Sequence, residues 1–347
     1  MFFEQPKKER KLMNEDLMVL AKQPTNNPES LEILDSYPRY ALTPIQHDYP
    51  GKTPTIWNSV YKTLKVDSIM AMVVSDIEDV EQVTKTLRED PKYIGGGVGV
   101  GFKDKIIHFL DELDPLAQAI GSVNVIKKMP NGNLRGYNTD GIGYLESLIP
   151  LVKKEDGKEI SNVKMAMLGA GGTGNSIVFA LAEVVGEIII LNRSIEKAKN
   201  LADRVNKYTG KNNCRASGED SIQEEVLDAD VIINVSTKGS AGELEEYSSL
   251  AVANLPVNTE SIEQNKKETE KTFGLINKDT IISDIILRNG DTPLITLAKK
   301  FGFKTLDGLP MVINQGVESF WLLHGEEMEK RGIKKEEVAK IIIDATK

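Results

Sequence analysis

The hydrophobic pattern of the chain is clearest between residues 163 and 191. Val163–Leu168 is an apolar run that predicts a short buried strand. A glycine-rich turn, 169–174, follows it, and apolar residues then recur at helical spacing over 177–185. Glu187–Leu191 is a second apolar run. This order predicts a strand, a turn, a helix and a second strand, which together form one βαβ unit.

The turn itself reads Gly169-Ala170-Gly171-Gly172-Thr173-Gly174, with the spacing G-x-G-x-x-G. Between a strand and a helix, this spacing is typical of a dinucleotide-binding turn. Glycines allow backbone N–H groups to approach a pyrophosphate, which then lies at the positive end of the helix. A loop that merely turns the chain is the alternative interpretation.

The residues after the second strand indicate which dinucleotide is bound. They are Asn192-Arg193-Ser194, followed by Lys197. An NAD site usually carries a carboxylate there for the ribose 2′-hydroxyl, whereas a guanidinium, a hydroxyl and an ammonium suit a 2′-phosphate. The sequence therefore predicts NADP as the cofactor. The alternative is two solvated charges at the start of a helix.

The first part of the chain also predicts alternating strands and helices. Apolar runs at 40–45 and 68–74 are each followed by an amphipathic helix, the second one capped by Asp76. A hairpin is expected over 123–137, around the turn Pro130–Asn133. Apolar spacing from Ile106 to Leu113 predicts a helix before it.

Between these elements, residues 95–103 alternate Gly with Val before ending in Phe102 and Lys103. This pattern predicts a strand with one face free of side chains, which another backbone or a ligand can approach closely. A flexible loop is the alternative.

After the βαβ unit the pattern predicts a helix over 195–205, a buried strand over 229–234 and a strand over 280–287. Residues 240–278 are acidic, rich in lysine and weakly apolar, which indicates a surface insertion, partly helical or disordered. The remaining elements are a helix over 293–301, a strand over 304–306, a helix that carries Gln315, and an amphipathic helix over 334–345.

Composition narrows the function classes. The 347 residues are enough for two domains, and a net charge of −9 argues against a nucleic-acid partner. Cys214 is the only cysteine and lies in a polar stretch, which excludes a disulfide framework and indicates an inert thiol. His47, His108 and His324 are scattered, so we expect no metal site. The chain has no long apolar run and no signal-peptide pattern at its start, which predicts a cytoplasmic protein without a membrane span.

A family resemblance rests on five stretches between about Tyr40 and Gly325. They are Gly121–Asn124, Asn138–Gly143, Gly169–Gly172, Asn192–Ser194, and Asp307–Leu309 with Gln315. In residue types and spacing they resemble the shikimate dehydrogenase family. The resemblance implies an α/β fold with an N-terminal α/β substrate domain, an NADP-binding Rossmann domain, and C-terminal helices that return to the first domain.

The implied boundaries are an N-terminal extension over 1–38, a substrate-binding catalytic domain over 39–145 plus 312–347, and a Rossmann domain over 146–311 with the insertion at about 240–278. The implied reaction is reduction of 3-dehydroshikimate to shikimate with NADPH, a step of aromatic amino acid biosynthesis. Relatives act on quinate or on other ring hydroxy acids. The expected partner is a small-molecule substrate, and the expected assembly is a monomer or a homodimer.

The resemblance also assigns roles to single residues. The family's catalytic lysine and aspartate correspond to Lys103 and Asp140. Its substrate-binding asparagine and glutamine correspond to Asn124 and Gln315, and Gly308 falls in a cofactor-binding motif.

Several positions depart from the family pattern. The family's catalytic lysine ends a segment Gly-x-Asn-Val-Thr-x-Pro-x-Lys, whose Asn, Thr and Pro are here Gly97, Gly99 and Gly101. These glycines are expected to leave room in the pocket wall for a bulkier ligand or for a backbone N–H contact.

The end of the site that holds the substrate carboxylate is also altered. The family's Ser-x-Ser-Pro has only Gly51-Lys52-Thr53-Pro54 as a match, and a tyrosine after the fifth Rossmann strand is Leu287. Thr53 is therefore the candidate hydroxyl for the carboxylate, and Lys52 a substitute positive charge.

Two other functions remain open at this point. A catalytically weak or inactive NADP-binding sensor could use the same fold, since fold does not imply function; the retention of Lys103 and Asp140 counts against it. A dehydrogenase of an unrelated 2-hydroxy acid would need a histidine–carboxylate pair that the chain does not offer.

Overall fold

The computed structural model describes residues 31–46, 52–156 and 159–346. The described residues form two compact units, one made of those up to Thr139 and from Gln315 onward, the other of Asp140–Asn314. The predicted boundaries after residues 145 and 311 lie a few residues from these. His47 and residues 1–30 of the predicted N-terminal extension lie outside the described residues.

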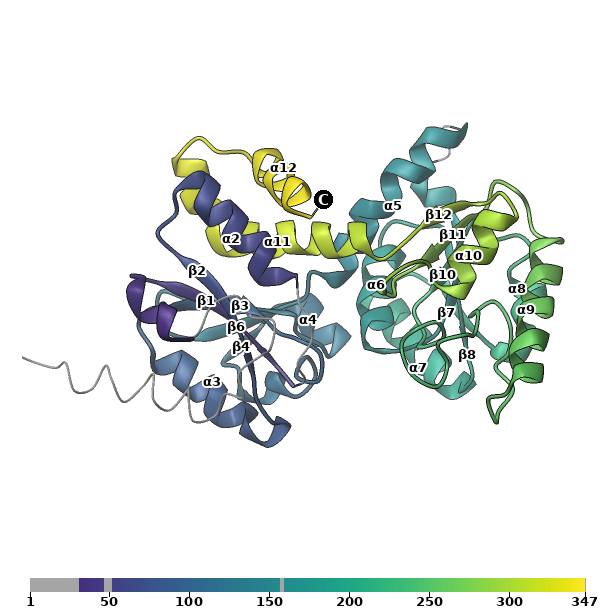
Figure 1. Cartoon of the computed structure of the whole chain (residues 1–347), viewed down its shortest axis with the longest axis horizontal. Helices are drawn as coiled ribbons and strands as arrows, with labels where there is room; N and C mark the ends of the chain where they lie inside the picture. Colours follow the sequence, from purple (N-terminus) through teal and green to yellow (C-terminus); the bar gives the residue numbers. More distant parts are fainter. Residues whose placement is uncertain (1–30, 47–51, 157–158, 347) are drawn as a thin grey trace, which may run out of the picture. The chain divides into compact units, whose positions relative to one another are not determined.

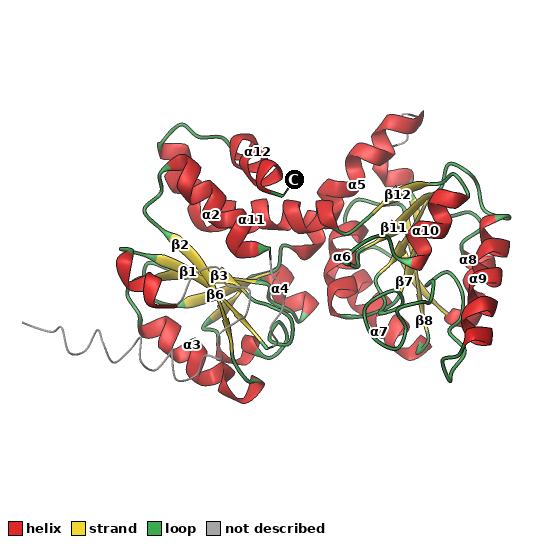
Figure 2. Ribbon diagram, viewed as in Figure 1, coloured by secondary structure: helices red, strands yellow, loops and turns green. Residues whose placement is uncertain are grey.

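The first unit contains a six-stranded mixed sheet (Figures 1 and 2). β1 lies between β2 and β3 and is parallel to both, whereas β3 and β5 are antiparallel. β5 and β6 form the predicted hairpin, and β4 pairs with β6. In sheet order the strands are β2 (Ile69–Val74), β1 (Tyr40–Ile45), β3 (Tyr93–Gly97), β5 (Val125–Lys128), β6 (Leu134–Tyr137) and β4 (Glu112–Leu113).

Helices cover both faces of this sheet. Figure 1 shows α2, α11 and α12 over one face and α3 over the other. The helices are α2 (Thr53–Leu64), α3 (Val80–Glu89), α4 (Pro115–Ile120), α11 (Leu309–Lys330) and α12 (Lys335–Ala345), with 3-10 turns η1 (Leu31–Ser36), η2 (Ile77–Asp79) and η3 (Ile106–Phe109). α11 begins in the second unit and continues from Gln315 in the first.

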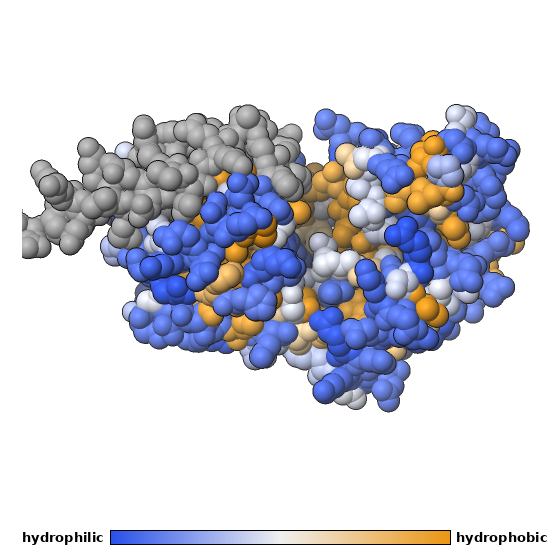
Figure 3. All heavy atoms as spheres, turned by 90° about the horizontal axis from the view of Figure 1, so that it is seen from below, coloured by the Kyte–Doolittle hydropathy of each residue, from blue (hydrophilic) through white to orange (hydrophobic). Residues whose placement is uncertain are grey.

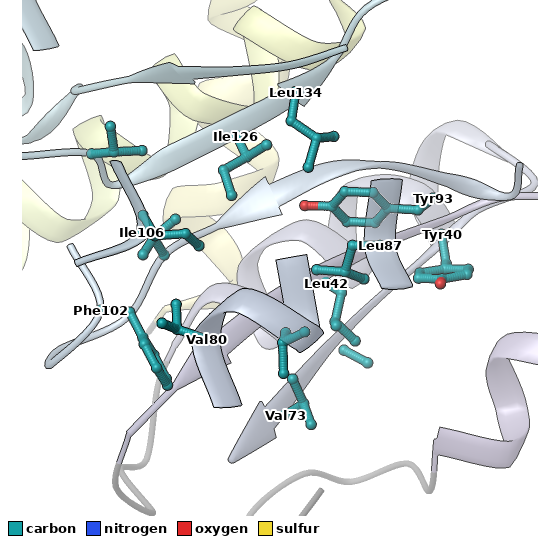
Figure 4. Close-up of a cluster of buried hydrophobic side chains, with 14 of the residues drawn as sticks. Tyr40, Leu42, Val73, Val80, Leu87, Tyr93, Phe102, Ile106, Ile126 and Leu134 are labelled. Atoms are coloured by element: carbon teal, nitrogen blue, oxygen red, sulfur yellow. The ribbon is translucent and has the colours of Figure 1, made fainter. Parts of the chain in front are cut away.

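The core of the first unit lies between the sheet and α3. Leu42 and Val73 from β1 and β2 meet Leu87 of α3, and Ile126 and Leu134 extend the cluster along the hairpin (Figure 4). All five side chains are at most 1% exposed, so each contributes roughly 1.5–3 kcal/mol of hydrophobic stabilisation.

The second unit is a doubly wound Rossmann domain. Its six strands are all parallel, and the predicted βαβ unit lies at its centre. In sheet order they are β12 (Lys304–Leu306), β11 (Ile281–Asp284), β10 (Val231–Asn234), β7 (Lys164–Leu168), β8 (Glu187–Asn192) and β9 (Cys214–Gly218).

Figure 1 shows α6 and α7 on one face of this sheet and α8, α9 and α10 on the other. Strand side chains such as Ile189 and Ile232 pack there with Phe273 of α9 and Leu294 of α10. The helices are α5 (Asp140–Asp156), α6 (Gly172–Ala182), α7 (Ile195–Thr209), α8 (Ile222–Glu225), α9 (Thr259–Phe273) and α10 (Pro293–Lys300), with 3-10 turns η4 (Ile160–Asn162) and η5 (Glu219–Ser221).

Three predictions of elements were wrong or incomplete in the first unit. The helix expected from Ile106 to Leu113 is only the short turn η3 followed by β4, because Asp111 and Asp114 bind Leu134 and Gly136 of β6 instead of continuing a helix. Asp76 is the N-cap of the turn η2, whereas the second amphipathic helix, which Asp76 was expected to cap, begins at Val80 with Asp79 as its N-cap. The strand expected over 95–103 ends at Gly97.

In the second unit the sequence missed β9, an edge strand with few apolar side chains. Cys214 begins this strand and is buried, and burial raises the pKa of its thiol to about 12. The segment 240–278 is partly helical, which confirms the first of the two expected alternatives: α9 spans Thr259–Phe273. The side chains that α9 buries are mostly polar, so a search for apolar periodicity does not locate the helix: Ser261, Asn265, Thr269, Thr272 and Phe273.

Among the described helices, none is long and apolar enough to span a membrane. The face of the described surface that Figure 3 shows is mainly hydrophilic, with hydrophobic side chains in several smaller areas.

Candidate active site and cofactor site

The glycine turn between β7 and α6 is tight at both ends. Gly169 has φ +118°, and a Cβ there would lie 2.8 Å from the backbone nitrogen of Ser236. A Cβ on Gly174 would lie 2.8 Å from Cγ2 of Val235, so its absence lets α6 approach the loop after β10. Only glycine fits both positions, as the fingerprint requires.

The middle of the turn is open. Gly171 and Gly172 are exposed, and a Cβ on either would meet no atom closer than 3.8 Å. Gly171 is the N-cap of the 11-residue helix α6 and makes no side-chain capping bond. The first N–H groups of a helix have no partner within it, and here the space beside them is open. Ala170, Thr173 and these glycines therefore fit the pyrophosphate of a dinucleotide.

A groove of about 320 Å³ lies beside the turn. Ala170 and Asn175 line it on one side, and α7 lines the other through residues that include Glu196 and Lys197. Among the described residues, the buried Oδ1 atom of Asn175 has no hydrogen-bond partner. This acceptor is therefore available to a donor of a ligand bound in the groove. Asn175 was not identified from the sequence.

The predicted 2′-phosphate residues lie where β8 passes into α7. Asn192 is the last residue of β8, and its side-chain amide donates a 2.9 Å hydrogen bond to the backbone oxygen of Ser194, the N-cap of α7. Arg193, Ser194 and Lys197 are exposed. Lys197 lines the groove, whereas Arg193 and Ser194 do not. The assignment of these residues to the cofactor stays a prediction.

Gly308 is the last predicted cofactor residue, and the structure gives it a packing role. It is buried just before α11, and a Cβ there would lie 2.4 Å from the backbone oxygen of Ile285, which follows β11. Its contact with the cofactor stays a prediction.

Asp284 ends β11, at the carboxyl edge of the Rossmann sheet, and the sequence did not identify it as a site residue. Its carboxylate accepts hydrogen bonds from Asn234, Thr292 and the backbone N–H of Ile286. Burial raises the pKa of Asp284 to about 6 despite these bonds. The three bonds fix the loops that follow β10 and β11.

In the first unit, two of the predicted substrate residues are brought together. The side-chain amide of Asn124 donates to Oε1 of Gln315 at 3.3 Å and to Oγ1 of Thr139 at 3.0 Å. The backbone N–H of Thr139 donates to Oδ1 of Asn124 at 2.8 Å. Residues far apart in the sequence thus share one hydrogen-bonded cluster.

Ser319 completes this cluster. Its hydroxyl lies 2.9 Å from Oγ1 of Thr139 and donates to the backbone oxygen of Gln315 at 2.6 Å. Sequence reasoning gave neither Thr139 nor Ser319 a role. Two signals in the sequence were available. Thr139 stands directly before Asp140. Ser319 follows Gln315 by four residues, which places Gln315 and Ser319 on the same face of a helix.

Each predicted catalytic residue is linked to this cluster through a residue next to it in the chain. The backbone oxygen of Lys103 accepts a 2.8 Å hydrogen bond from the N–H of Val123, the neighbour of Asn124. Asp140 directly follows Thr139, begins α5, and is 5% exposed. Their catalytic roles stay predictions.

The glycines at 97, 99 and 101 do not open the pocket wall, which corrects the expectation of added room. A Cβ on Gly97 would lie 2.7 Å from Oγ1 of Thr43, and one on Gly99 would lie 2.0 Å from Cγ2 of Ile45. The Gly97 N–H already donates to Thr43 Oγ1 at 3.1 Å, so this amide is not offered to a ligand. Side chains of β1 and of the residue after it thus fill the space that the family's larger residues would take.

The predicted carboxylate end is only partly described. Gly51 lies outside the described residues, Lys52 is exposed, and Thr53 is the half-buried first residue of α2. Ile56, one turn later, lies 3.5 Å from a Cβ built on Gly316, so the start of α2 packs against α11 next to Gln315. Leu287 is 36% exposed.

Family models match both units. A model described as the shikimate dehydrogenase substrate binding domain matches residues 43–126, and one described as shikimate / quinate 5-dehydrogenase matches residues 151–247.

A curated relative, shikimate dehydrogenase (NADP(+)) of Alkaliphilus metalliredigens, is 31% identical over 306 residues, covering 86% of this chain and 93% of the relative. Among solved structures, a shikimate dehydrogenase in complex with NADP⁺ is 25% identical with a TM-score of 0.69, covering 93% and 99% of the two chains. Shikimate dehydrogenase of Aquifex aeolicus is 27% identical with a TM-score of 0.65, covering 89% and 98%. The chain belongs to the shikimate dehydrogenase family.

Proposed function

We propose that the protein is an NADP-dependent dehydrogenase that transfers a hydride between NADPH and a ring keto acid of the 3-dehydroshikimate class, forming shikimate or its quinate counterpart. The observation that carries this proposal is the hydrogen-bonded cluster of Asn124, Thr139 and Gln315. Asp140 directly follows Thr139, and the backbone of Lys103 is bonded to Val123, the neighbour of Asn124. The similarity to NADP-dependent shikimate dehydrogenases supports the same reaction.

The chemistry needs a positive charge at the ketone oxygen. NADPH, when bound, supplies the hydride, and negative charge then develops on the substrate oxygen. We assign to the Lys103 ammonium the stabilisation of this oxygen and delivery of the proton that completes the alcohol. Asp140 is assigned to orient Lys103 and to share its proton.

The hydroxyl groups of the ring fit the polar cluster of the first unit. Asn124 and Gln315 hold each other in place at 3.3 Å, so their remaining donor and acceptor positions have fixed directions. Binding groups that are fixed before the substrate arrives lose less entropy when it binds. We therefore assign recognition of the ring hydroxyls to Asn124 and Gln315.

For the substrate carboxylate we propose Thr53 together with the exposed Lys52. Thr53 lies at the start of α2, where the N–H groups of the first turn and the positive end of the helix favour an anion. With Gly97, Gly99 and Gly101 closed by side chains near β1, the pocket is expected to accept a ring of ordinary size rather than a bulkier ligand.

The cofactor part of the proposal is NADP, bound at the glycine turn with its 2′-phosphate on Arg193, Ser194 and Lys197. The open centre of the turn supports a dinucleotide there, and Oδ1 of Asn175 is an acceptor available beside it. Two positive charges and the absence of an acid at the end of β8 support the phosphorylated form.

The test is an activity screen in both directions with purified protein, with NADP⁺ or NAD⁺ paired with shikimate, quinate and ring analogues that lack the carboxylate. We expect turnover with NADP⁺ and shikimate or quinate, and at least a roughly tenfold preference over NAD⁺ because one charge-assisted phosphate contact is worth about 1.5–3 kcal/mol. Tight NADPH binding without turnover of any ring hydroxy acid would favour a non-catalytic sensor instead.

A further inference from the structure

A largely buried ion pair joins the loop after β10 to the 3-10 turn η5 at the carboxyl edge of the Rossmann sheet. The Lys238 ammonium contacts the Glu219 carboxylate and donates a 2.6 Å hydrogen bond to the backbone oxygen of Ala251. The side chains of Lys238 and Glu219 are only 7% and 16% exposed. Removing two charges from water largely offsets their attraction, so such a pair is a weak source of stability.

Glu219 stands next to the proposed 2′-phosphate site. Asn192 and Gly218 are paired residues at the ends of the neighbouring strands β8 and β9, and Arg193 and Glu219 directly follow them. Lys238 comes from the loop after β10, although β7 and β8 lie between β10 and β9 in the sheet. The lysine therefore reaches across two strand positions to meet this carboxylate.

The three charges act on one another. Burial holds the pKa of Lys238 below its usual range, the Glu219 carboxylate opposes this shift, and the nearby Arg193 charge adds to it. Within residues 159–346, no acid forms an ion pair with Arg193. Arg193 thus lies near the Lys238–Glu219 pair, but the Glu219 carboxylate does not neutralise its charge.

A carboxylate at this edge has a known effect on cofactor choice. A carboxylate near the ribose binds the 2′-hydroxyl of NAD and repels the 2′-phosphate of NADP. Without Lys238, Glu219 would be an uncompensated acid next to Arg193. It would pair with the guanidinium and cancel the charge that the phosphate needs.

We propose that Lys238 sets the preference for NADP by holding the Glu219 carboxylate in a buried pair, which leaves Arg193 available to the 2′-phosphate. This inference rests on the proposed function. Lys238 is a positioning residue, since it acts on the cofactor through Glu219 and Arg193.

The test compares NADPH and NADH affinities by fluorescence titration, which needs no turnover. Lys238→Met, of similar length but uncharged, should weaken NADPH binding at least about fivefold because an acid is released beside the phosphate site. NADH binding should stay unchanged or tighten. Lys299→Met is the matched control: Lys299 lies on α10 and forms an exposed ion pair with Asp291, and losing it should leave both affinities the same.

Two further variants separate masking of Glu219 from a direct contact of Lys238 with the cofactor. Glu219→Gln combined with Lys238→Met removes both charges and should restore NADPH affinity to within about twofold of the wild type. If the double variant binds NADPH as weakly as Lys238→Met, the masking role is wrong. Where Lys238→Met alone fails to fold, Glu219→Gln decides: it should bind NADPH at least as tightly as the wild type, and fivefold weaker binding overturns the proposal.

Arg193→Ala distinguishes this inference from the cofactor assignment itself. Loss of NADPH affinity in Arg193→Ala but not in Lys238→Met overturns the role of Lys238 and leaves the NADP assignment standing. Unchanged NADPH affinity in Arg193→Ala contradicts the NADP assignment.

Discussion

At the scale of single residues, the polar groups of the substrate unit hold one another in fixed positions. Thr139 bonds both Asn124 and Ser319, and Ser319 bonds the backbone of Gln315. Each side chain is therefore oriented by a neighbour before any ligand binds. This arrangement favours recognition of a ring with several hydroxyl groups, because preorganised groups bind at lower entropic cost.

Lys103 is the residue on which the chemistry depends most. Lys103→Ala should lower kcat by roughly 10²–10⁴-fold, the usual worth of a positioned proton donor, while NADPH affinity stays the same. Steady-state kinetics and a cofactor titration on the same protein measure the two quantities. Turnover within a few-fold of the wild type would remove Lys103 from the mechanism.

Gly97 tests how the pocket wall is built. Gly97→Asn restores the family's residue but places its Cβ 2.7 Å from Oγ1 of Thr43, so we expect a loss of about 1–3 kcal/mol in unfolding free energy. Thr43→Ala should relieve the clash, so that the double variant is more stable than the sum of the single effects by about 1 kcal/mol. Urea unfolding of the four proteins measures this coupling.

Gly316→Ala is the control for this comparison of the Gly97 and Thr43 variants. Its Cβ would meet Ile56 at 3.5 Å, an ordinary contact, and Gly316 lies inside α11. This substitution should be neutral or stabilising by up to about 1 kcal/mol. Strictly additive effects at Gly97 and Thr43 would show that the two side chains do not compete for one space.

At the scale of elements, α9 shows how a weakly apolar helix is held in a fold. Asn265 is 2% exposed and accepts a hydrogen bond from the N–H of Ser248. Its amide donates to the backbone oxygens of Ser248, Ala251 and Val252. The backbone oxygen of Ala251 also accepts the hydrogen bond from Lys238, so α9 holds in place the segment to which Lys238 is bonded.

Asn265→Ala should lower the unfolding free energy by roughly 2–3 kcal/mol, because it leaves buried backbone groups without partners. Gln264→Ala, next to it on α9, removes only an exposed bond to Glu268 and should stay within about 0.5 kcal/mol of the wild type. Equal stabilities of the two variants would mean that the Asn265 bonds do not fix this loop.

α2 and α11 meet through an aromatic cluster that contains a buried histidine. Trp57 and Tyr61 of α2 pack against Phe320 and His324 of α11, and the Tyr61 hydroxyl lies 2.8 Å from Nε2 of His324. Burial lowers the pKa of His324 to about 3, and the charges of Arg39 and Lys127 act in the same direction. His324 is therefore neutral in the folded protein.

This histidine should make the protein sensitive to acid. Below its usual pKa, His324 takes up a proton in the unfolded chain but not in the folded one, so stability falls as the pH falls. From about pH 7 to about pH 5, the wild type should lose roughly 2 kcal/mol more unfolding free energy than His324→Phe. Asp284, whose pKa is raised, acts in the opposite sense but is common to both proteins.

Urea unfolding at the two pH values gives the four free energies that this comparison needs. Parallel losses of stability in the wild type and in His324→Phe would show that His324 titrates similarly in the folded and unfolded states.

The elements with a clear apolar period could be predicted from the sequence, and the others could not. The βαβ unit, the hairpin and α12 were confirmed because a single face or run of each is apolar. β9 is a polar edge strand, and α9 buries hydroxyl and amide side chains, so neither has a hydrophobic signal.

The candidate site shows the same limit. Asn124 and Gln315 were predicted from a family resemblance, and the structure brings them into contact. The role of Thr43 could not be predicted, because it depends on how β1 faces the glycines of β3 in space. Lys238 and Glu219 likewise lie 19 positions apart and meet only through the strand order.

At the scale of the whole molecule, the proposed cofactor-binding, catalytic and substrate-binding residues are divided between the two units. The Rossmann unit carries the glycine turn, Arg193 and Asp140, and the substrate unit carries Lys103 and the Asn124 cluster. Each part has a structural basis of its own, and the family membership links them to one reaction.

Transfer of the hydride from the substrate to the nucleotide tests the proposed dehydrogenase reaction most directly. The wild-type protein is incubated with NADP⁺ and with shikimate that carries deuterium on the carbon of the oxidised hydroxyl, and the nucleotide is analysed by mass spectrometry. We predict that the deuterium appears in NADPH, and that Lys103→Ala slows its appearance by roughly 10²-fold or more. If the protein binds NADP⁺ tightly and the deuterium stays in the ring of shikimate, and of quinate tested in the same way, the protein is not a dehydrogenase of this substrate class.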